Sequence, residues 1–382
     1  MIVYLLMLGI SLIFAFLSIK KGRKQKMIFQ MLSSLPFIVV SAIRYGVGTD
    51  YLFRYVPDYL IIYEGANVPN LELVIKLIMK FCCIFTNDYC LFFIITSIII
   101  NSLVFFSIYK YSRKPIISIF IYLINSSFFL SMNLVRQYIS SSLFIISFFL
   151  SFDNKKKIKT WICMILACFF HTSAVFFIPI IWIRKKKMND VLLVVLSVIT
   201  IFLGRPILQF ILNLFSYLDI ENLSKYSVYV SQKGNLPFSS LFVEVAVYLY
   251  FCYIFSKNIA KIDEKKKAIA YINIQWFVVL FTVACSINEL FIRVSSMLTL
   301  FQVFSIPYFY YIGKNSYTKD DGNKYKINEF LFLAIITIMI IRIIYSIIIK
   351  GSANVLPYKT VFNRPDNIYS QMNYIEYHYN KK

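Results

Sequence analysis

The sequence predicts an all-α, polytopic integral membrane protein, a helical bundle of about ten spans. The composition is the first reason, because 59% of the 382 residues are hydrophobic and only 15% are charged. A soluble domain carries roughly 25% charged residues. The length of the apolar runs is the second reason. Runs such as Leu91–Tyr109 and Phe330–Ile349 approach the roughly 20 residues that a helix needs to cross the hydrocarbon core.

The distribution of basic residues predicts the topology. Lys and Arg outnumber Asp and Glu by 40 to 18, which gives a net charge of +22. They form short clusters between the apolar runs, as cytoplasmic loops do under the positive-inside rule. The clusters are Lys20–Lys26, Lys110–Lys114, Lys155–Lys159, Arg184–Lys187, Lys257–Lys267 and Lys314–Lys326. Nucleic acid is not an expected partner, since no folded soluble domain remains to bind it.

Placing these clusters on the cytoplasmic side predicts one transmembrane domain over residues 1–349, with both termini external. The expected spans are Ile2–Ile19, Met27–Ile43, Leu91–Tyr109, Ile116–Leu130, Gln137–Phe152, Val191–Phe215, Phe238–Ser256, Ala268–Ile287, Val294–Ile312 and Ile327–Ile349. External loops are expected at about residues 44–70 and 216–237. Residues 350–382 are expected to form an external C-terminal tail.

One external segment is apolar but too short to span. Leu71–Phe85 contains Lys76 and Lys80, and its apolar residues recur at helical spacing. This pattern predicts an external helix that lies in the membrane interface.

Two further segments are expected to be broken. Thr160–Ile183 has a basic cluster on each side, so we expect a re-entrant hairpin or two short helices that turn near His171. The alternative is a single span whose following basic loop lies outside. A second break is expected in Val191–Phe215, at the Gly204-Arg205-Pro206 sequence.

Five polar residues stand at predicted external ends of spans: Arg44, Asp50, Arg136, His171 and Arg293. An arginine guanidinium presents a planar fork of donors that matches phosphate oxygens. A neutral imidazole or a carboxylate can take a proton from an attacking hydroxyl. The predicted external segments contain no Asp-x-Asp pair, which disfavours a metal-dependent phosphate site. The seven cysteines form no Cys-x-x-Cys pair, so they predict neither a metal site nor a disulfide.

Structural explanations stay open for these residues. Arg44 and Arg136 can be interfacial anchors, and His171 can be a hydrogen-bonded structural residue. Glu289 stands four residues before Arg293, so the two can pair on one helix face. No role is assigned to three further residues in or beside apolar runs, which are Glu72, Glu244 and Arg342.

Three motifs together resemble the EpsG family of Wzy-type exopolysaccharide, capsule or O-antigen polymerases. They are Arg44-Tyr-Gly-Val-Gly-Thr-Asp-Tyr51, Arg136-Gln137 at the start of a span, and Phe170-His171-Thr-Ser-Ala174. Their order and spacing cover nearly the whole chain, together with a late external arginine at Arg293. The family often has Glu-Pro-Gly before the short external helix, where this chain has Pro69-Asn70-Leu71-Glu72. No family role is therefore carried over to Glu72.

The resemblance implies a metal-independent glycosyltransferase without a cofactor. It would join undecaprenyl-diphosphate-linked repeat units at the outer face of the bacterial cytoplasmic membrane, alongside a flippase and a chain-length regulator. It implies that Arg44, Arg136 and Arg293 hold the diphosphate, with His171 or Asp50 as the base. It also implies sugar-binding or supporting roles for Tyr45, Tyr51, Gln137 and Glu289.

Two other functions stay open. A lipid-linked oligosaccharide flippase or another transporter would also be polytopic and basic, but its charged groups usually lie near the bilayer midplane within repeats. The sequence shows no internal repeat, and its unusual charges gather at one predicted face. A membrane acyltransferase would also use an intramembrane histidine, but its donor would arrive from the cytoplasmic side.

Overall fold

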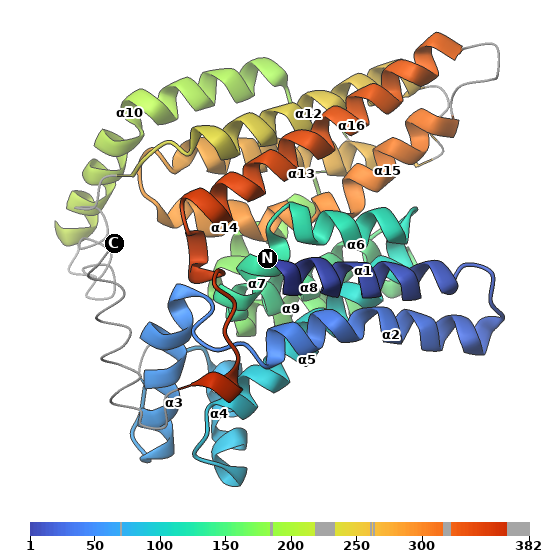
Figure 1. Cartoon of the computed structure of the whole chain (residues 1–382). Coiled ribbons are helices and arrows are strands. Elements are labelled where there is room, and N and C mark those ends of the chain that lie inside the picture. Colours follow the sequence, from blue (N-terminus) through green and yellow to red (C-terminus); the bar gives the residue numbers. More distant parts are fainter. Residues whose placement is uncertain are drawn as a thin grey trace. The chain divides into compact units, whose positions relative to one another are not determined.

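The computed structural model describes residues 1–68, 71–183, 186–217, 234–259, 262, 264–315 and 322–364. Within these residues every regular element is a helix (Figure 1). One isolated β-bridge joins Arg44 and Thr360. The chain divides into two compact units, which are described separately below. The first unit is Met1–Phe176 with Ile343–Lys382, and the second unit is Phe177–Arg342.

The described helices confirm a helical membrane protein but not its predicted ten spans. Five are long and apolar enough to cross a membrane, and two bent pairs raise the number to seven. The five are Cys90–Tyr111, Asp190–Phe210, Phe238–Asn258, Lys265–Ala284 and Lys326–Ile349. Two predicted spans form apolar helices of only 16 residues, Ile2–Leu17 and Val135–Leu150.

The first unit begins with α1 (Ile2–Leu17), α2 (Arg23–Ala42), the π-helical turn η1 (Tyr51–Tyr55) and α3 (Val56–Tyr63). It continues with α4 (Leu73–Phe85), α5 (Cys90–Tyr111), α6 (Pro115–Ile124), α7 (Ser127–Asn133), α8 (Val135–Leu150), η2 (Asn154–Lys156) and α9 (Lys157–Phe170). Its core is aromatic. Phe37 of α2 packs against Phe105, Tyr122 and Phe128 with ring centroids 4.9–5.6 Å apart. Such buried rings supply much of the apolar area that holds helices together.

The predicted span Ile116–Leu130 is not one straight helix. It is divided into α6 and α7, which meet at an angle of 56°. Asn125 ends α6, and its side chain accepts a hydrogen bond from the backbone N–H of Ser127 at 3.0 Å. Ser126 between them has φ +70°. An Asn side chain that bonds the backbone two residues on competes with a continuous helix.

Helix α4 (Leu73–Phe85) confirms the short helix predicted at Leu71–Phe85, and its interfacial location stays a prediction. It has 13 residues and buries Ile75, Met79 and Cys82 against the protein. A second apolar stripe points outward, formed by Leu73, Leu77, Phe81, Ile84 and Phe85. A short helix that is apolar on both sides can pack on protein with one side and contact lipid with the other.

The break predicted near His171 is confirmed. Helix α9 ends at Phe170, and His171 has extended backbone angles, φ −158° and ψ 120°. The 3₁₀ helix η3 (Thr172–Ile181) follows. Its tighter winding cannot continue the α-helical hydrogen-bond pattern.

The start of the predicted tail packs on the first unit. After η6 (Tyr345–Ile349) and η7 (Ser352–Asn354), residues Val355–Arg364 form a segment that we call the C-terminal strap and that includes η8 (Val361–Asn363). Tyr45 N–H donates to the carbonyl of Lys359, and Val361 N–H donates to the carbonyl of Ile43, both at 2.9 Å. Residues 365–382 of the predicted tail lie outside the described residues.

The second unit contains the later part of η3, α10 (Asp190–Tyr217), α12 (Phe238–Asn258), α13 (Lys265–Ala284), α14 (Leu290–Thr299), α15 (Gln302–Asn315) and most of α16 (Gly322–Ile344). The predicted break at Gly204-Arg205-Pro206 is wrong, because α10 continues through Pro206. A proline removes one backbone donor, yet helices in apolar surroundings tolerate that loss. The expected loop 216–237 is described only at its two ends.

The predicted span Val294–Ile312 is also bent. Helices α14 and α15 meet at 44°. Thr299 Oγ1 donates to the carbonyl of Ser296 at 2.8 Å, and Ser296 Oγ donates to the carbonyl of Arg293 at 2.8 Å. Hydroxyls that bond back to the preceding turn bend a helix.

Candidate functional site

Four polar side chains from distant parts of the chain meet in the first unit. His171 Nδ1 lies 2.8 Å from Glu72 Oε1, and Arg136 Nη1 donates to the other oxygen of Glu72. Gln137 Nε2 lies 3.2 Å from His171 Nε2. The side chains of Glu72, Arg136 and His171 are 12%, 13% and 16% exposed. This group, which we call the His171 cluster, is thus shielded from bulk water but reachable from the surface.

The packing of α8 against α9 assembles most of this cluster. Ser140 Oγ donates to the carbonyl of Ala167, and Ser147 Oγ donates to the carbonyl of Thr160, each at 2.8 Å. Small hydroxyl side chains of this kind let two helices approach closely. The pairs show that the helices run antiparallel, so the start of α8 lies beside the end of α9. The first turn of α8 carries the arginine and the glutamine, and the histidine directly follows α9.

Glu72 adds the fourth side chain from the start of α4. It is the N-cap residue of that helix, with extended backbone angles. Burial raises the pKa of Glu72, but the hydrogen bond from His171 and the charge of Arg136 outweigh it and lower the pKa to about 2. Glu72 is therefore a carboxylate at neutral pH and can only accept hydrogen bonds. No role for Glu72 is predicted from the sequence, and only its contacts identify it.

The ionised Glu72 determines which nitrogen of His171 carries the proton. The Nδ1 atom must donate to the carboxylate, so in the neutral ring the lone pair lies on Nε2. A carboxylate that orients an imidazole in this way also stabilises the imidazolium that forms when the ring takes a proton. The pair therefore has the arrangement of a general base with its orienting group.

Arg136 supplies a cationic group beside His171 and Glu72. Among the described residues its side-chain partners are Glu72 and Tyr55, and Cζ lies 6.0 Å from the centroid of the Tyr55 ring. A guanidinium carries five N–H donors. Arg136 can therefore bind a further anion without releasing Glu72.

Two more charged residues, Arg54 and Asp58, lie near Arg136. Arg54 Nε donates to Asp58 Oδ2 at 3.2 Å. Burial raises the pKa of Asp58, and the positive charges of Arg54 and Arg136 oppose that rise. The charge of Asp50, which the sequence predicts as an alternative base, acts on Tyr55 beside Arg136. Arg54 and Asp58 were not predicted from the sequence, because a basic and an acidic residue in a loop resemble an ordinary surface pair.

Arg44 lies in the interior, with 1% exposure. Its guanidinium donates to Ser97 Oγ at 3.0 Å, to the carbonyl of Met132 at 3.1 Å and to the carbonyl of Ser41. Its Cζ lies 4.9 Å from the centroid of the Phe93 ring. Burial lowers the pKa of Arg44 to about 10, so it stays charged at neutral pH. These contacts support a structural role, and its binding of diphosphate stays a prediction.

The two tyrosines of the same motif are also buried. Tyr51 stacks on Phe93 with centroids 3.9 Å apart and planes 8° apart, and it contacts Tyr45 edge-on at 6.2 Å. Both tyrosines are at most 2% exposed. Neither ring presents a face to the surface in this structure, so stacking on sugars stays a prediction for them.

The glycines of the motif let its loop pack on α7. Gly48 has φ +97°, and a Cβ there would lie 2.9 Å from the Cα of Asn133. Asn133 Oδ1 accepts from the N–H of Asp50 at 2.8 Å and from Thr49 Oγ1 at 3.2 Å. An L side chain at position 48 would be strained by φ and blocked by backbone. This close approach explains the motif physically.

The remaining predicted site residues belong to the second unit. Glu289 is the residue before α14, and Arg293 lies in the first turn of that helix. Their predicted roles, support and diphosphate binding, stay predictions.

The second unit has a buried polar network that the sequence did not interpret. Glu244 of α12 is 2% exposed. Its carboxylate accepts from Gln275 at 3.0 Å, from Gln302 and from Arg342 at 3.4 Å. One carboxylate thus joins α12, α13, α15 and α16. Polar groups in an apolar interior hold helices together when each is hydrogen-bonded.

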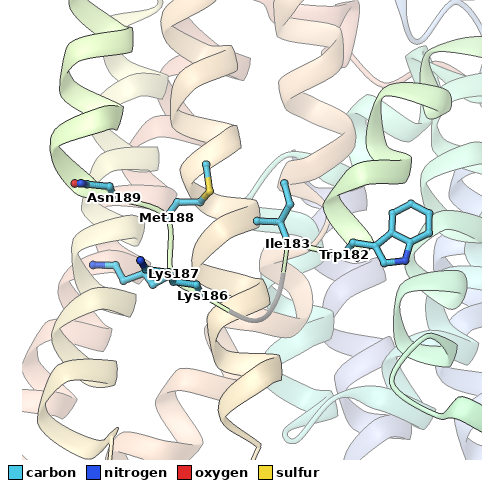
Figure 2. A pocket seen from close by; sticks show the side chains of 6 residues that line it. All are labelled: Trp182, Ile183, Lys186, Lys187, Met188 and Asn189. Carbon is cyan, nitrogen blue, oxygen red and sulfur yellow. The ribbon is translucent and has the colours of Figure 1, made fainter.

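A cavity of about 580 Å³ also lies in the second unit (Figure 2). It is lined by Trp182, Ile183, Lys186, Lys187, Met188 and Asn189. Asn273 of α13 holds this lining segment in place, because its side-chain amide donates to the carbonyls of Ile183 and Lys186 at 2.8 and 3.0 Å. The lysines belong to the predicted cytoplasmic cluster Arg184–Lys187, whose first two residues lie outside the described residues. Figure 2 shows Trp182 pointing away from the lysines.

Comparison with known proteins identifies a family for the chain. No curated protein and no solved structure matches it. A family model does match, over residues 27–360, a range that includes the His171 cluster, the Arg44 motif and the Glu244 network. The chain therefore belongs to the EpsG family, a family of membrane proteins of polysaccharide biosynthesis.

Proposed function

We propose that this protein is a polysaccharide polymerase. It transfers a glycan from undecaprenyl diphosphate to a sugar hydroxyl of another lipid-linked repeat unit, at the outer face of the bacterial cytoplasmic membrane. Membership of the EpsG family supports the pathway. The observation that carries the reaction type is the His171 cluster, in which a carboxylate-oriented imidazole lies beside an arginine.

The proposed reaction is a displacement at the anomeric carbon of the donor sugar. His171 Nε2 takes the proton from the acceptor hydroxyl, and the acceptor oxygen bonds to the anomeric carbon. The bond from that carbon to the diphosphate oxygen breaks, and its electron pair leaves with undecaprenyl diphosphate. Glu72 stabilises the imidazolium formed. Asp50 is the alternative base.

Arg136 is the arginine that we propose for the diphosphate. It is cationic and partly exposed, and it donates a hydrogen bond to Glu72, the residue that orients His171. Holding the charge that develops on the leaving group stabilises the transition state. Arg293 remains a proposed second contact. Arg44, which is buried, is proposed to support the site from within the first unit.

The test uses purified protein in detergent with defined, already flipped lipid-linked repeat units. The wild-type protein should lengthen them, and His171→Ala should lower the rate by about 10²–10⁴-fold, the usual contribution of a general base. The matched control is His378→Ala, which changes the other histidine of the chain and should keep full activity.

This assay separates the proposal from its alternatives. A flippase cannot form polymer in detergent, because no membrane separates the substrates. An acyltransferase would modify the repeat units without joining them. Folded wild-type protein that fails to lengthen its native repeat unit would overturn the polymerase proposal.

A further inference from the structure

The side-chain amide of Gln137 contacts Nε2 of His171, the nitrogen that takes the proton in the proposed glycosyl transfer. Its amide Nε2 lies 3.2 Å from His171 Nε2. An amide NH₂ group can only donate, and Glu72 keeps the ring proton on Nδ1. In the neutral ring, the lone pair on Nε2 therefore already accepts a hydrogen bond from Gln137 before any substrate binds.

The other end of the same amide is unsatisfied. Gln137 is 7% exposed, and its Oε1 is buried with no hydrogen-bond partner among the described residues. A buried acceptor without a donor is unfavourable and uncommon in proteins. The side chain is thus arranged to engage the imidazole at the expense of its own oxygen.

We propose that Gln137 is a latch on the base. While no acceptor sugar is bound, its N–H caps the lone pair of His171 and prevents a water molecule from being deprotonated there. The acceptor hydroxyl displaces the amide and takes its place on Nε2. The latch thereby protects the lipid-linked donor from hydrolysis. This inference rests on the proposed glycosyl transfer.

Two competing reactions define what the latch controls. In transfer, the acceptor O–H bond breaks, the acceptor oxygen bonds to the anomeric carbon, and undecaprenyl diphosphate leaves. In hydrolysis, water replaces the acceptor, so the products are a free reducing glycan and undecaprenyl diphosphate. Both reactions need a free Nε2 lone pair on His171, and the two differ only in the hydroxyl that displaces Gln137.

The unsatisfied oxygen has a use after proton transfer. The protonated ring carries N–H on both nitrogens. If the Gln137 amide turns over, its Oε1 can accept from Nε2–H, which satisfies both groups at once. The same side chain therefore suits the neutral ring in one orientation and the charged ring in the other.

The first experiment replaces Gln137 by a side chain of similar length without an amide. With the purified assay, free glycan and polymer are measured together, with and without acceptor. Gln137→Met should raise the ratio of hydrolysis to transfer by about tenfold or more, since an available general base is typically worth 10²–10⁴-fold. The matched control, Gln30→Met on α2, should leave the ratio unchanged. An unchanged ratio in folded Gln137→Met, or an equal loss of both reactions, would overturn the latch.

The second measurement does not depend on activity. The chain has two histidines, so His378→Gln leaves one ¹⁵N-labelled imidazole to observe in nanodiscs. Its Nε2 signal should shift when Gln137→Met is added and stay in place with Gln30→Met. An unmoved signal would refute the contact on which the latch depends. Wild-type protein that neither transfers nor hydrolyses the donor would instead refute the proposed function, while the signal still reports on the contact.

Discussion

The Glu72 side chain determines the charge and the hydrogen bonding of the His171 cluster. Its two oxygens hold different partners, His171 on one and Arg136 on the other. These partners lower its pKa to about 2 against the effect of burial. The same charge thus determines the tautomer of the neutral His171 ring and keeps Arg136 beside it. Loss of that charge should affect stability as well as reaction rate.

The pKa of Glu72 predicts a pH dependence of stability. Because the pKa in the folded protein lies below the ordinary value of 4.5, ionised Glu72 contributes stability above about pH 4.5. This contribution is lost as the pH falls towards 2, and at about 1.4 kcal/mol per pKa unit it amounts to about 3 kcal/mol. The thermal unfolding midpoint in detergent should therefore fall less between pH 5 and pH 3 in Glu72→Gln than in the wild type. Glu64→Gln, at an exposed site, should behave like the wild type, and equal falls in all three proteins would contradict the prediction.

At the scale of the elements, three helix ends carry the candidate site, and a loop packs next to them. The start of α4, the start of α8 and the end of α9 carry the His171 cluster, and the Arg44–Tyr51 loop packs on α7 beside them. Helix ends are suitable places for such side chains because their backbone leaves the regular hydrogen-bond pattern there. The loop can lie this close to α7 because Gly48 has no side chain.

Gly48→Ala tests that approach. The new Cβ would meet the backbone of Asn133 at 2.9 Å and would also be strained by φ +97°. We expect a destabilisation of at least about 2 kcal/mol, measured as a lower thermal unfolding midpoint in detergent. Gly65→Ala is the matched control, since Gly65 has φ +83° and open space around its Cβ position. It bears the cost of the backbone angle alone. Equal losses in the two variants would show that the contact with α7 contributes nothing.

The sequence predicts helices well and their meeting points poorly. Hydrophobic runs and basic clusters identified the helical membrane class and the break at His171, because both signals are local. The proline in α10 gave a wrong break, since a local signal does not report how an apolar environment tolerates a lost hydrogen bond. Glu72 lies 99 positions from His171 and 64 from Arg136, so no periodicity relates them. Arg44 follows a predicted span, and its sequence position is the same whether the side chain turns outward or inward.

At the scale of the whole molecule, the chain is a membrane protein of the EpsG family that divides into two units, and its described residues contain five to seven helices long and apolar enough to cross a membrane. The predicted topology follows from the basic clusters alone. The segment Thr160–Ile183 is where this topology can be tested. A hairpin there keeps the following lysines cytoplasmic, whereas a single span would place them outside.

Cysteine labelling in a background without native cysteines tests this topology. An impermeant reagent added to intact cells should label Ala66→Cys, in the loop predicted to be external. It should not label Lys186→Cys until the membrane is opened, since the positive-inside rule places that loop in the cytoplasm. Outside labelling at both positions would establish a single span at Thr160–Ile183.

The C-terminal strap has a consequence for the order in which the protein is made. Tyr358 donates to the carbonyl of Val40, 318 positions earlier, and Tyr45 and Ile43 find backbone partners on the same strap. The ribosome therefore produces the whole second unit before the first unit can close. A chain stopped before the strap would leave backbone groups beside Arg44 without these partners, which is costly away from water. The earliest segment can therefore close only after translation has passed α16 and reached the strap.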